Sequence, residues 1–363
     1  MSTRPAPSRI TPPIEPRSLS HRDGDWQQAM RDAITDIDTL FAELSLPQAY
    51  KPAARRAAEL FGLRVPRSYV RRMQPGAIDD PLLRQVLPLG AETESHPDFV
   101  ADAVGDNASA AGDGLLHKYH GRALLVTTGA CAVHCRYCFR RHFDYAGQHA
   151  GGSHTEAAMA RIAADDSIAE VLLSGGDPLS LSNARLEAIG RRLDMIDHVQ
   201  RLRLHTRTAI VLPERIDSGL IEWLAARRAR CVVVVHVNHP NELSAATIDA
   251  LAAMRKTGAL LLNQAVLLAD INDDVDTQVR LSEALFEAGV MPYYLHLLDR
   301  VRGTHHFEVA ETDAVALMQT VSGRLPGYLV PKLAREGAGD EAKSVLGIRA
   351  RPAAAAGRKN PEG

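Results

Sequence analysis

The sequence predicts an α/β protein built around a partial (β/α)6 barrel. Short apolar runs alternate with helical patterns, and after the first pair successive runs start about 30 residues apart, the usual length of a βαβ unit. The run Val232–Val235 is apolar without alternation, which is typical of a parallel strand covered on both faces. With 363 residues, 45% of them hydrophobic, the chain can form one large domain with an N-terminal addition.

The elements before the barrel are expected to be helical. Trp26 to Leu46 carries apolar residues at helical spacing, and Lys51 to Phe61 is predicted to form a second, shorter helix. A loop-rich region around Pro66 to Gly114 follows. Met1 to Ser20 is rich in Pro, Ser and Arg and has no hydrophobic stretch, so we expect a loose leader and not a signal peptide.

Six strands separated by helices make up the predicted barrel. The strands are Ala123–Thr127, Glu170–Leu173, Arg201–Leu204, Cys231–Val237, Ala259–Leu262 and Pro292–Leu297. The helical patterns include Asn183–Leu193, Pro213–Arg227, Ala245–Lys256, Val275–Ala288 and Thr312–Ser322. Nothing after Ser322 continues the alternation, so the sequence favours six units over eight.

These patterns divide the chain into five expected parts. They are a disordered leader (1–22), a helical region (23–115), the partial barrel (116–325), a short C-terminal segment (326–349) and a tail (350–363). The tail has few core-forming residues and is expected to be disordered.

Composition narrows the class of protein. The 42 basic residues nearly balance the 44 acidic ones, giving a net charge of −2 and no reason to expect a nucleic-acid surface. No apolar run approaches the about 20 residues that span a bilayer. Three of the four cysteines fall within eight residues, which is a poor disulfide framework. A reducing cytoplasm and a metal or redox site are therefore expected.

Cys131, Cys135 and Cys138 directly follow the first predicted barrel strand. Three thiolates are soft ligands suited to iron–sulfur clusters. On a four-iron cluster they leave one iron open to a small molecule. The alternatives are a zinc site, which usually takes four protein ligands and would need His134 or His142, or simple burial of free thiols. Burial is disfavoured because Arg136, Arg140, Arg141 and His142 indicate a polar loop.

Polar side chains end several of the other strands. They lie in Ser174–Pro178, His205–Arg207, His236–Glu242, Asn263–Gln264 and Tyr293–Asp299. Because the carboxyl ends of parallel strands meet at one barrel mouth, we expect a shared site there. Gly175 and Gly176 let a ligand approach the backbone closely, although a tight turn would also require glycine. Cys231 opens a buried strand and is expected to be a small core residue.

The Cys-x3-Cys-x2-Cys spacing, with Tyr137 before the last cysteine, resembles the signature of the radical S-adenosylmethionine (SAM) superfamily. This resemblance implies that the three cysteines hold a [4Fe–4S] cluster whose open iron binds SAM. From about Trp26 to Lys343 the chain also resembles the lysine 2,3-aminomutase family. The matching stretches are Leu116–Tyr119, Cys138–Arg141, Leu173–Leu179, Asn238–Glu242, Asn263–Leu267 and Pro292–Asp299.

The family resemblance implies pyridoxal phosphate (PLP) as a further cofactor. Gly337-Ala-Gly339-Asp-Glu-Ala-Lys343 matches the segment of the PLP-binding lysine, which makes Lys343 the candidate and Lys332 its rival. Lys118 and Tyr119 match positions near the cofactor phosphate. The remaining cofactor-binding positions implied are Ser174, Gly175, Gly176, Asp177, Arg207, His236 and Gln264.

The same resemblance implies L-lysine as substrate. Arg140 stands where a guanidinium binds the substrate carboxylate, and Asp299 aligns with one of two acids that bind the distal ammonium. The second acid is not evident, because the chain reads Tyr328-Leu-Val-Pro331 where the family has one. An external reductant is also implied.

The chain is most similar to the bacterial EF-P-(R)-β-lysine synthase branch of the family. It has no cysteine after Cys231, where metabolic members carry a zinc-binding C-terminal region, and it has the N-terminal helix around Trp26. This branch implies (R)-β-lysine as product, and elongation factor P (EF-P) or its lysyl ligase as partner. Two alternatives stay open: an aminomutase for another amino acid such as glutamate, which Asp299 would repel, or a non-catalytic iron–sulfur redox or binding protein.

Overall fold

The computed structural model describes residues 25–106, 114–145, 153–340 and 342–347. The expected leader and tail therefore lie outside the described residues. The core of the fold is a nine-stranded sheet whose spatial order follows the chain. Its strands are β1 (Leu115–Tyr119), β2 (Arg122–Thr128), β3 (Glu170–Gly175), β4 (Arg201–Thr206), β5 (Arg230–Val235), β6 (Leu260–Val266), β7 (Met291–His296), β8 (Lys332–Arg335) and β9 (Ser344–Val345).

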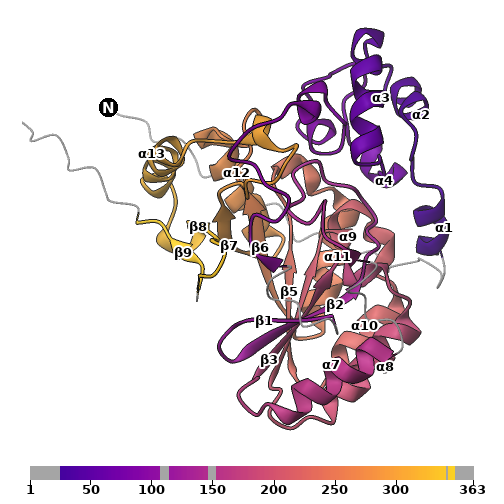
Figure 1. Ribbon diagram of the computed structural model, residues 1–363, viewed down its shortest axis with the longest axis vertical. Coiled ribbons are helices and arrows are strands. Elements are labelled where there is room, and N and C mark those ends of the chain that lie inside the picture. Colours follow the sequence, from indigo (N-terminus) through magenta and orange to yellow (C-terminus); the bar gives the residue numbers. More distant parts are fainter. Residues whose placement is uncertain (1–24, 107–113, 146–152, 341, 348–363) are drawn as a thin grey trace, which may run out of the picture.

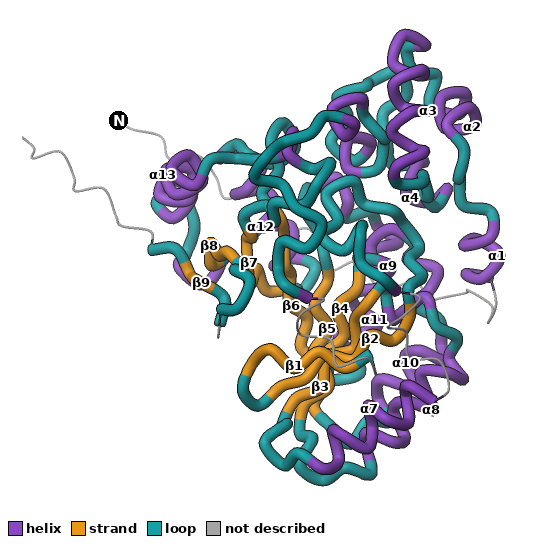
Figure 2. The backbone as a smooth tube through the Cα atoms, viewed as in Figure 1, coloured by secondary structure: helices purple, strands orange, loops and turns teal. Residues whose placement is uncertain are grey.

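The sheet is parallel from β2 to β8, with β1 and β9 antiparallel at its two edges. All six predicted strands are present, and Figure 2 shows the strands gathered at the centre of the molecule. The mixed α/β fold with a partial barrel is confirmed.

Helices follow the strands, and four of them begin at side-chain caps. They are α7 (Ser153–Ala164), α8 (Asn183–Asp194), α9 (Thr208–Val211), α10 (Ser218–Ala225), α11 (Ala245–Lys256), α12 (Val275–Glu287) and α13 (Glu311–Ser322). Ser182, Asp217, Ser244 and Asp274 each accept a hydrogen bond from the backbone N–H three residues later. Such caps satisfy donors that a helix start leaves free, which is why these helices begin where they do.

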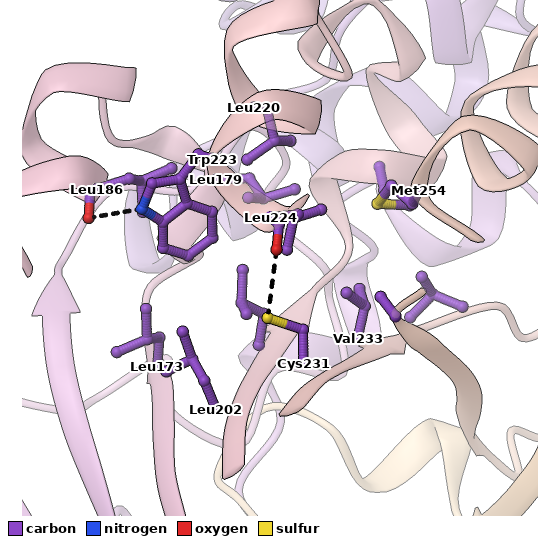
Figure 3. Close-up of a cluster of buried hydrophobic side chains, with 14 of the residues drawn as sticks. Leu173, Leu179, Leu186, Leu202, Leu220, Trp223, Leu224, Cys231, Val233 and Met254 are labelled. Carbon is purple, nitrogen blue, oxygen red and sulfur yellow. Dashed lines mark hydrogen bonds between the residues drawn. The ribbon is translucent and has the colours of Figure 1, made fainter. Parts of the chain in front are cut away.

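The largest core lies between the strands and these helices. Leu173, Leu202 and Val233 of three neighbouring strands pack in one cluster with Leu186 of α8 and Trp223 of α10 (Figure 3). Cys231 belongs to the same cluster, its thiol pointing at the Leu224 carbonyl. Burial raises the pKa of Cys231 to about 11, so it is a neutral core residue, as expected.

Two short helices replace the single one expected over 26–46. They are α1 (Asp25–Arg31) and α2 (Ile37–Glu43). Between them Ile34 forms a β-bridge to Val65, and Asp36 caps α2 through the Thr39 N–H at 2.7 Å. The apolar spacing continues through the break, because Ile34 is buried as well, and spacing alone therefore could not reveal it. The next helix, α3 (Lys51–Leu60), lies where it was predicted.

The expectation that the alternation stops at Ser322 is wrong. After α13 the chain enters β8, which pairs in parallel with β7. Only the two central residues of Lys332-Leu-Ala-Arg335 are buried. A four-residue strand with a charge at each end gives no apolar run, so the sequence pattern misses it.

The helical N-terminal region packs on the barrel beside the cysteines. Its core, which includes Phe41 of α2 and Tyr69 of α4 (Arg67–Val70), continues into Ala132 and Val133 of the cysteine loop. Figure 1 shows these helices, in indigo, at one side of the strands. Within the described part of the chain, no helix has the length and apolar character to cross a membrane.

Candidate functional site

The three clustered cysteines lie together in the loop after β2. Cys138 N–H donates to the Cys135 carbonyl at 3.1 Å, and all three thiols are free of disulfides. Burial raises the pKa of each thiol, to about 11 for Cys138. The fields of the neighbouring cysteines raise the pKa of Cys131 and Cys138 further. Three thiols that feel one another's charge form a suitable ligand set for a metal cluster.

The donor set of this loop suits an iron–sulfur cluster. Among the residues that the structure describes, no three His, Cys, Asp or Glu side chains are gathered as a single metal ion would require. Three thiolates are the soft ligands that iron–sulfur clusters take. By its chemistry the cysteine loop therefore fits a [4Fe–4S] cluster.

The loop is polar, as expected, but its arginine side chains are buried. The side chains of Arg136, Arg140 and Arg141 are at most 8% exposed. Each guanidinium pairs with a carboxylate from an earlier segment: Arg136 and Arg141 with Glu92, and Arg140 with Asp106 at 2.7 Å. Buried charges are tolerated only when paired, and the sequence pattern does not reveal partners 34 to 49 residues away.

The glycines after β3 are required by close chain packing. Gly175 has φ of +115°, and a Cβ on Gly176 would lie 2.3 Å from the carbonyl oxygen of Ala130. The tight-turn interpretation therefore explains Gly175, and contact with the start of the cysteine loop explains Gly176. Asp177 organises the same turn, because its carboxylate accepts bonds from Arg207 N–H at 2.7 Å and Thr208 N–H at 2.8 Å.

Arg207 is bound to protein groups from three segments. Its guanidinium donates to the Gln85 side chain at 2.8 Å and to the His236 carbonyl at 3.1 Å, and it lies 3.2 Å from Glu242. Ser174, at the end of β3, accepts from Arg140 at 3.2 Å. The structure thus brings both predicted residues to the carboxyl ends of the strands.

Several polar groups at the strand ends lack a protein partner. The Nε2 atoms of His205, His236 and His296 are buried without a hydrogen bond. The rings of His205 and His236 are 5.8 Å apart, edge to face. Burial lowers the pKa of all three, to about 3 for His236, so the rings are neutral. Gln264 lies on the adjacent strand β6. Unpaired buried nitrogens at a barrel mouth are what a polar ligand needs.

A seam between the two edges of the barrel contains the second group of predicted residues. The Tyr119 hydroxyl donates to Glu336 at 2.9 Å, and Lys118 lies 3.8 Å from the same carboxylate. Beside this contact is a cavity of about 60 Å³, lined in part by Asp106, Lys118, Tyr119, Arg122, Arg140 and Glu336. Three of these side chains are cationic, which suits a phosphate group. This space has room for only a few water molecules.

Lys343 lies at this seam and Lys332 does not. The Lys343 ammonium is 2.5 Å from Glu336, and its side chain is 22% exposed. Lys332, at the start of β8, is exposed, with its ammonium 5.9 Å from the ring centre of Tyr293. The donor set around Lys343 therefore fits PLP, with cations for the phosphate and an amine beside them.

Two carboxylates lie near Lys343. Burial and, after it, the charge of Glu336 raise the pKa of Asp299 to about 7. Burial acts on Glu336 as well, but Lys343 and the hydrogen bonds from Lys343 and Tyr119 hold its pKa below the usual range. Sequence reasoning did not single out Glu336, because it looked for an acid at 328–331. The available signal was an acid directly before the segment from Gly337 to Lys343.

Comparisons with known proteins agree with this geometry. A family described as a 4Fe-4S single cluster domain matches residues 112–209. The chain is 45% identical to an L-lysine 2,3-aminomutase of Escherichia coli K12 over 90% of this chain and 96% of that one. It is 39% identical to one of Haemophilus influenzae over 92% and 98%. A radical SAM methyltransferase structure from Sphaerobacter thermophilus covers 61% of this chain and 68% of its own, with a TM-score of 0.41 and 18% identity.

The extent of these matches, which run through the cysteine loop and the seam alike, settles the family. The chain belongs to the radical SAM lysine 2,3-aminomutase family, isomerases that transfer an amino group within one molecule and use a [4Fe–4S] cluster and SAM.

Proposed function

We propose that this protein converts L-lysine to (R)-β-lysine by moving the amino group from Cα to Cβ, with PLP as its third cofactor. The observation that carries the proposal is the ion pair of Glu336 with the Lys343 ammonium at 2.5 Å in the barrel seam, with Asp299 close enough that the charges of both groups shift its pKa. Acids that accommodate the alkylammonium of the Lys343 side chain can also accommodate the alkylammonium of a lysine substrate. The L-lysine 2,3-aminomutase relatives support the same substrate.

Each end of lysine has a matching side chain. We assign the substrate carboxylate to Arg140, whose planar guanidinium is fixed by Asp106 at 2.7 Å and Ser174 at 3.2 Å. We assign the distal ammonium to Asp299 and Glu336. A second carboxylate in that position, as in glutamate, would be repelled by both acids, so lysine is favoured over an acidic amino acid.

The cofactors are assigned to two sides of the barrel mouth. Cys131, Cys135 and Cys138 would hold the cluster, and His236, Gln264 and the turn from Ser174 to Gly176 would face SAM. Lys118, Tyr119 and Arg122 would hold the PLP phosphate, with Lys343 as the attachment point. In our assignment Arg207 and Asp177 shape the cofactor site through their protein contacts.

When bound, SAM on a reduced cluster supplies a carbon-centred radical, and PLP delocalises the unpaired electron while nitrogen migrates. The protein's own residues position the reactants. Arg140 and the two acids would hold lysine at both ends and so fix its orientation in the site. Glu336 holds the proton-bearing Lys343 in the absence of PLP. An external one-electron donor is required, and the neutral buried histidines would add hydrogen-bond partners without charge.

The test is an anaerobic assay of the reconstituted protein. Iron, sulfide, PLP, SAM, a strong reductant and L-lysine are supplied, and β-lysine enantiomers are separated by chiral chromatography. We expect (R)-β-lysine only with the complete mixture. Cys135→Ala should lose SAM cleavage and product, Lys343→Ala should lose product, and Lys332→Ala should retain both. Cleavage of SAM with lysine returned unchanged would reject lysine as the substrate while leaving the SAM assignment intact.

We further propose that the product serves EF-P modification. The support is the similarity of the N-terminal region around Trp26 and of the cysteine pattern to the EF-P-(R)-β-lysine synthase branch. The purified enzyme, EF-P and its lysyl ligase should together give EF-P with an added β-lysine mass. Replacing the active enzyme with Cys135→Ala should remove that mass, and chemical (R)-β-lysine should restore it. Persistence of the β-lysine mass with the inactive variant would reject the role.

A further inference from the structure

Glu92 of the N-terminal region binds both flanking arginines of the cysteine loop. Arg136 donates to its two oxygens at 2.8 and 2.5 Å, and Arg141 donates to the second oxygen at 2.8 Å. The side chains of Arg136 and Glu92 are fully buried, and that of Arg141 is 2% exposed. The first oxygen of Glu92 also accepts from the Leu89 N–H at 3.0 Å, which fixes the carboxylate itself. The three charges are therefore held in one geometry.

The same segment holds the backbone of the cysteine loop. His134 N–H donates to the Arg64 carbonyl at 2.9 Å, and Arg136 N–H donates to that of Gln85 at 2.9 Å. The ring of Phe61 lies under both guanidiniums, 4.9 and 4.7 Å from their carbon atoms. Residues 61–92 thus contact the loop between Cys131 and Cys138. The two guanidiniums share Glu92 and Phe61 as their supports.

The arrangement leaves one positive charge uncompensated beside the cysteines. Two guanidiniums face one carboxylate, and water is excluded from all three. Arg136 directly follows Cys135, and the Arg141 N–H donates to the Cys138 carbonyl at 3.3 Å. Low dielectric lets such a charge act over several ångströms.

We propose that Glu92 is a positioning residue for the iron–sulfur cluster, holding Arg136 and Arg141 as fixed cations that set how readily the cluster is reduced. The proposal rests on the cluster assignment made above. Reduction adds one negative charge to the cluster, so a buried cation nearby favours the reduced form. Glu92 moderates this effect, because its charge cancels one of the two cations while its hydrogen bonds fix both.

Two substitutions change the charge of this group in opposite directions. Arg141→Gln leaves the two-bond pair of Arg136 with Glu92 and removes the uncompensated charge, so the reduction potential should become more negative. Glu92→Gln retains a hydrogen-bond acceptor and adds one uncompensated charge, so the potential should become more positive. Arg324→Gln removes an arginine from an exposed ion pair with Asp276 and should leave the potential unchanged.

The measurement is an anaerobic redox titration of the reconstituted proteins, followed by the electron paramagnetic resonance signal of the reduced cluster. Iron and sulfide content is determined for each sample. Opposite shifts for Arg141→Gln and Glu92→Gln, with four irons retained in Arg141→Gln, support the proposal. Should Glu92→Gln not fold, the negative shift in Arg141→Gln and recovery of the wild-type potential in Glu92→Asp provide the test.

A purely structural role gives a different result. Unchanged potentials in iron-replete variants, or shifts of the same sign in both, overturn the proposal. Failure of the wild-type protein itself to take up four irons would instead reject the cluster assignment, so the two failures are distinguishable.

Discussion

The cysteine loop and the barrel seam differ in how extensively protein contacts hold their charged side chains. Around the loop, Arg136, Arg141 and Arg207 each bind a buried carboxylate and further protein groups. At the seam, Asp299 is a half-buried acid with a raised pKa, and Lys343 binds Glu336 beside a small cavity. The difference indicates a preformed cysteine loop, whereas in our proposal the charges of the seam are completed by its ligands.

The largest expected effect comes from breaking the preformed side. In Gly176→Ala, the new Cβ would lie 2.3 Å from the Ala130 carbonyl, and a backbone atom cannot move without shifting the cysteine loop. We expect loss of bound iron and of product, with destabilisation of about 1–3 kcal/mol. Iron content and thermal unfolding check this. Gly323→Ala, whose Cβ meets nothing closer than 3.5 Å, should retain iron and activity.

The next largest effect is expected at the seam. Glu336→Gln removes the charge that faces Lys343 and, in our proposal, the lysine ammonium. We expect kcat/KM for lysine to fall about a hundredfold, equivalent to about 2.7 kcal/mol, while iron content and SAM binding stay unchanged. Glu311→Gln, in an exposed pair with Arg335, is the matched control. Loss of iron in Glu336→Gln would contradict the separation of the two sides.

The protonation of Asp299 gives a pH dependence. Its pKa is raised from 3.8 to about 7, so the folded protein retains a proton that the unfolded chain has released. Stability of the cofactor-free protein should therefore fall as pH rises from about 4 to 7, by no more than about 4 kcal/mol, and level off above. Thermal unfolding across this range should show the slope in wild type and lose it in Asp299→Asn.

The pH dependence of catalysis should have the opposite sign to that of stability, because activity requires Asp299 to be ionised. An ammonium needs the ionised carboxylate, so kcat/KM for lysine should rise up to tenfold per pH unit as pH approaches 7. Asp299→Asn should be less active and lack this rise. If the variant keeps the wild-type profile, another group is responsible.

The smallest effect concerns the seam contact itself. Tyr119→Phe removes one hydrogen bond to Glu336, which Lys343 also binds. We expect the free energy of PLP binding to weaken by about 1 kcal/mol, which is a fivefold loss of affinity, as measured by absorbance titration. A loss as large as that of Glu336→Gln would show that the hydroxyl does more than orient the acid.

The sequence predicted the barrel because its strands are apolar and regularly spaced, and it predicted the cysteine loop because the ligand spacing is local. It did not predict β8, whose two buried residues carry no periodic signal. Nor did it predict that Glu92 would pair with Arg136, since ion pairs between distant segments leave no pattern in a single chain. The position of Glu336 was missed for a related reason: the acid was sought at an aligned position, although its contacts are made across the sheet edges.

The hydrogen bond between Tyr119 and Glu336 has a consequence for the order of folding. The two residues are 217 positions apart, whereas those joining Glu92 to the cysteine loop are 44 and 49 apart. Closing a longer loop costs more chain entropy, and during synthesis it must wait for the later partner. The Glu92 contacts of the cysteine loop are therefore available early on the ribosome, while the seam is completed only when almost the whole chain has emerged.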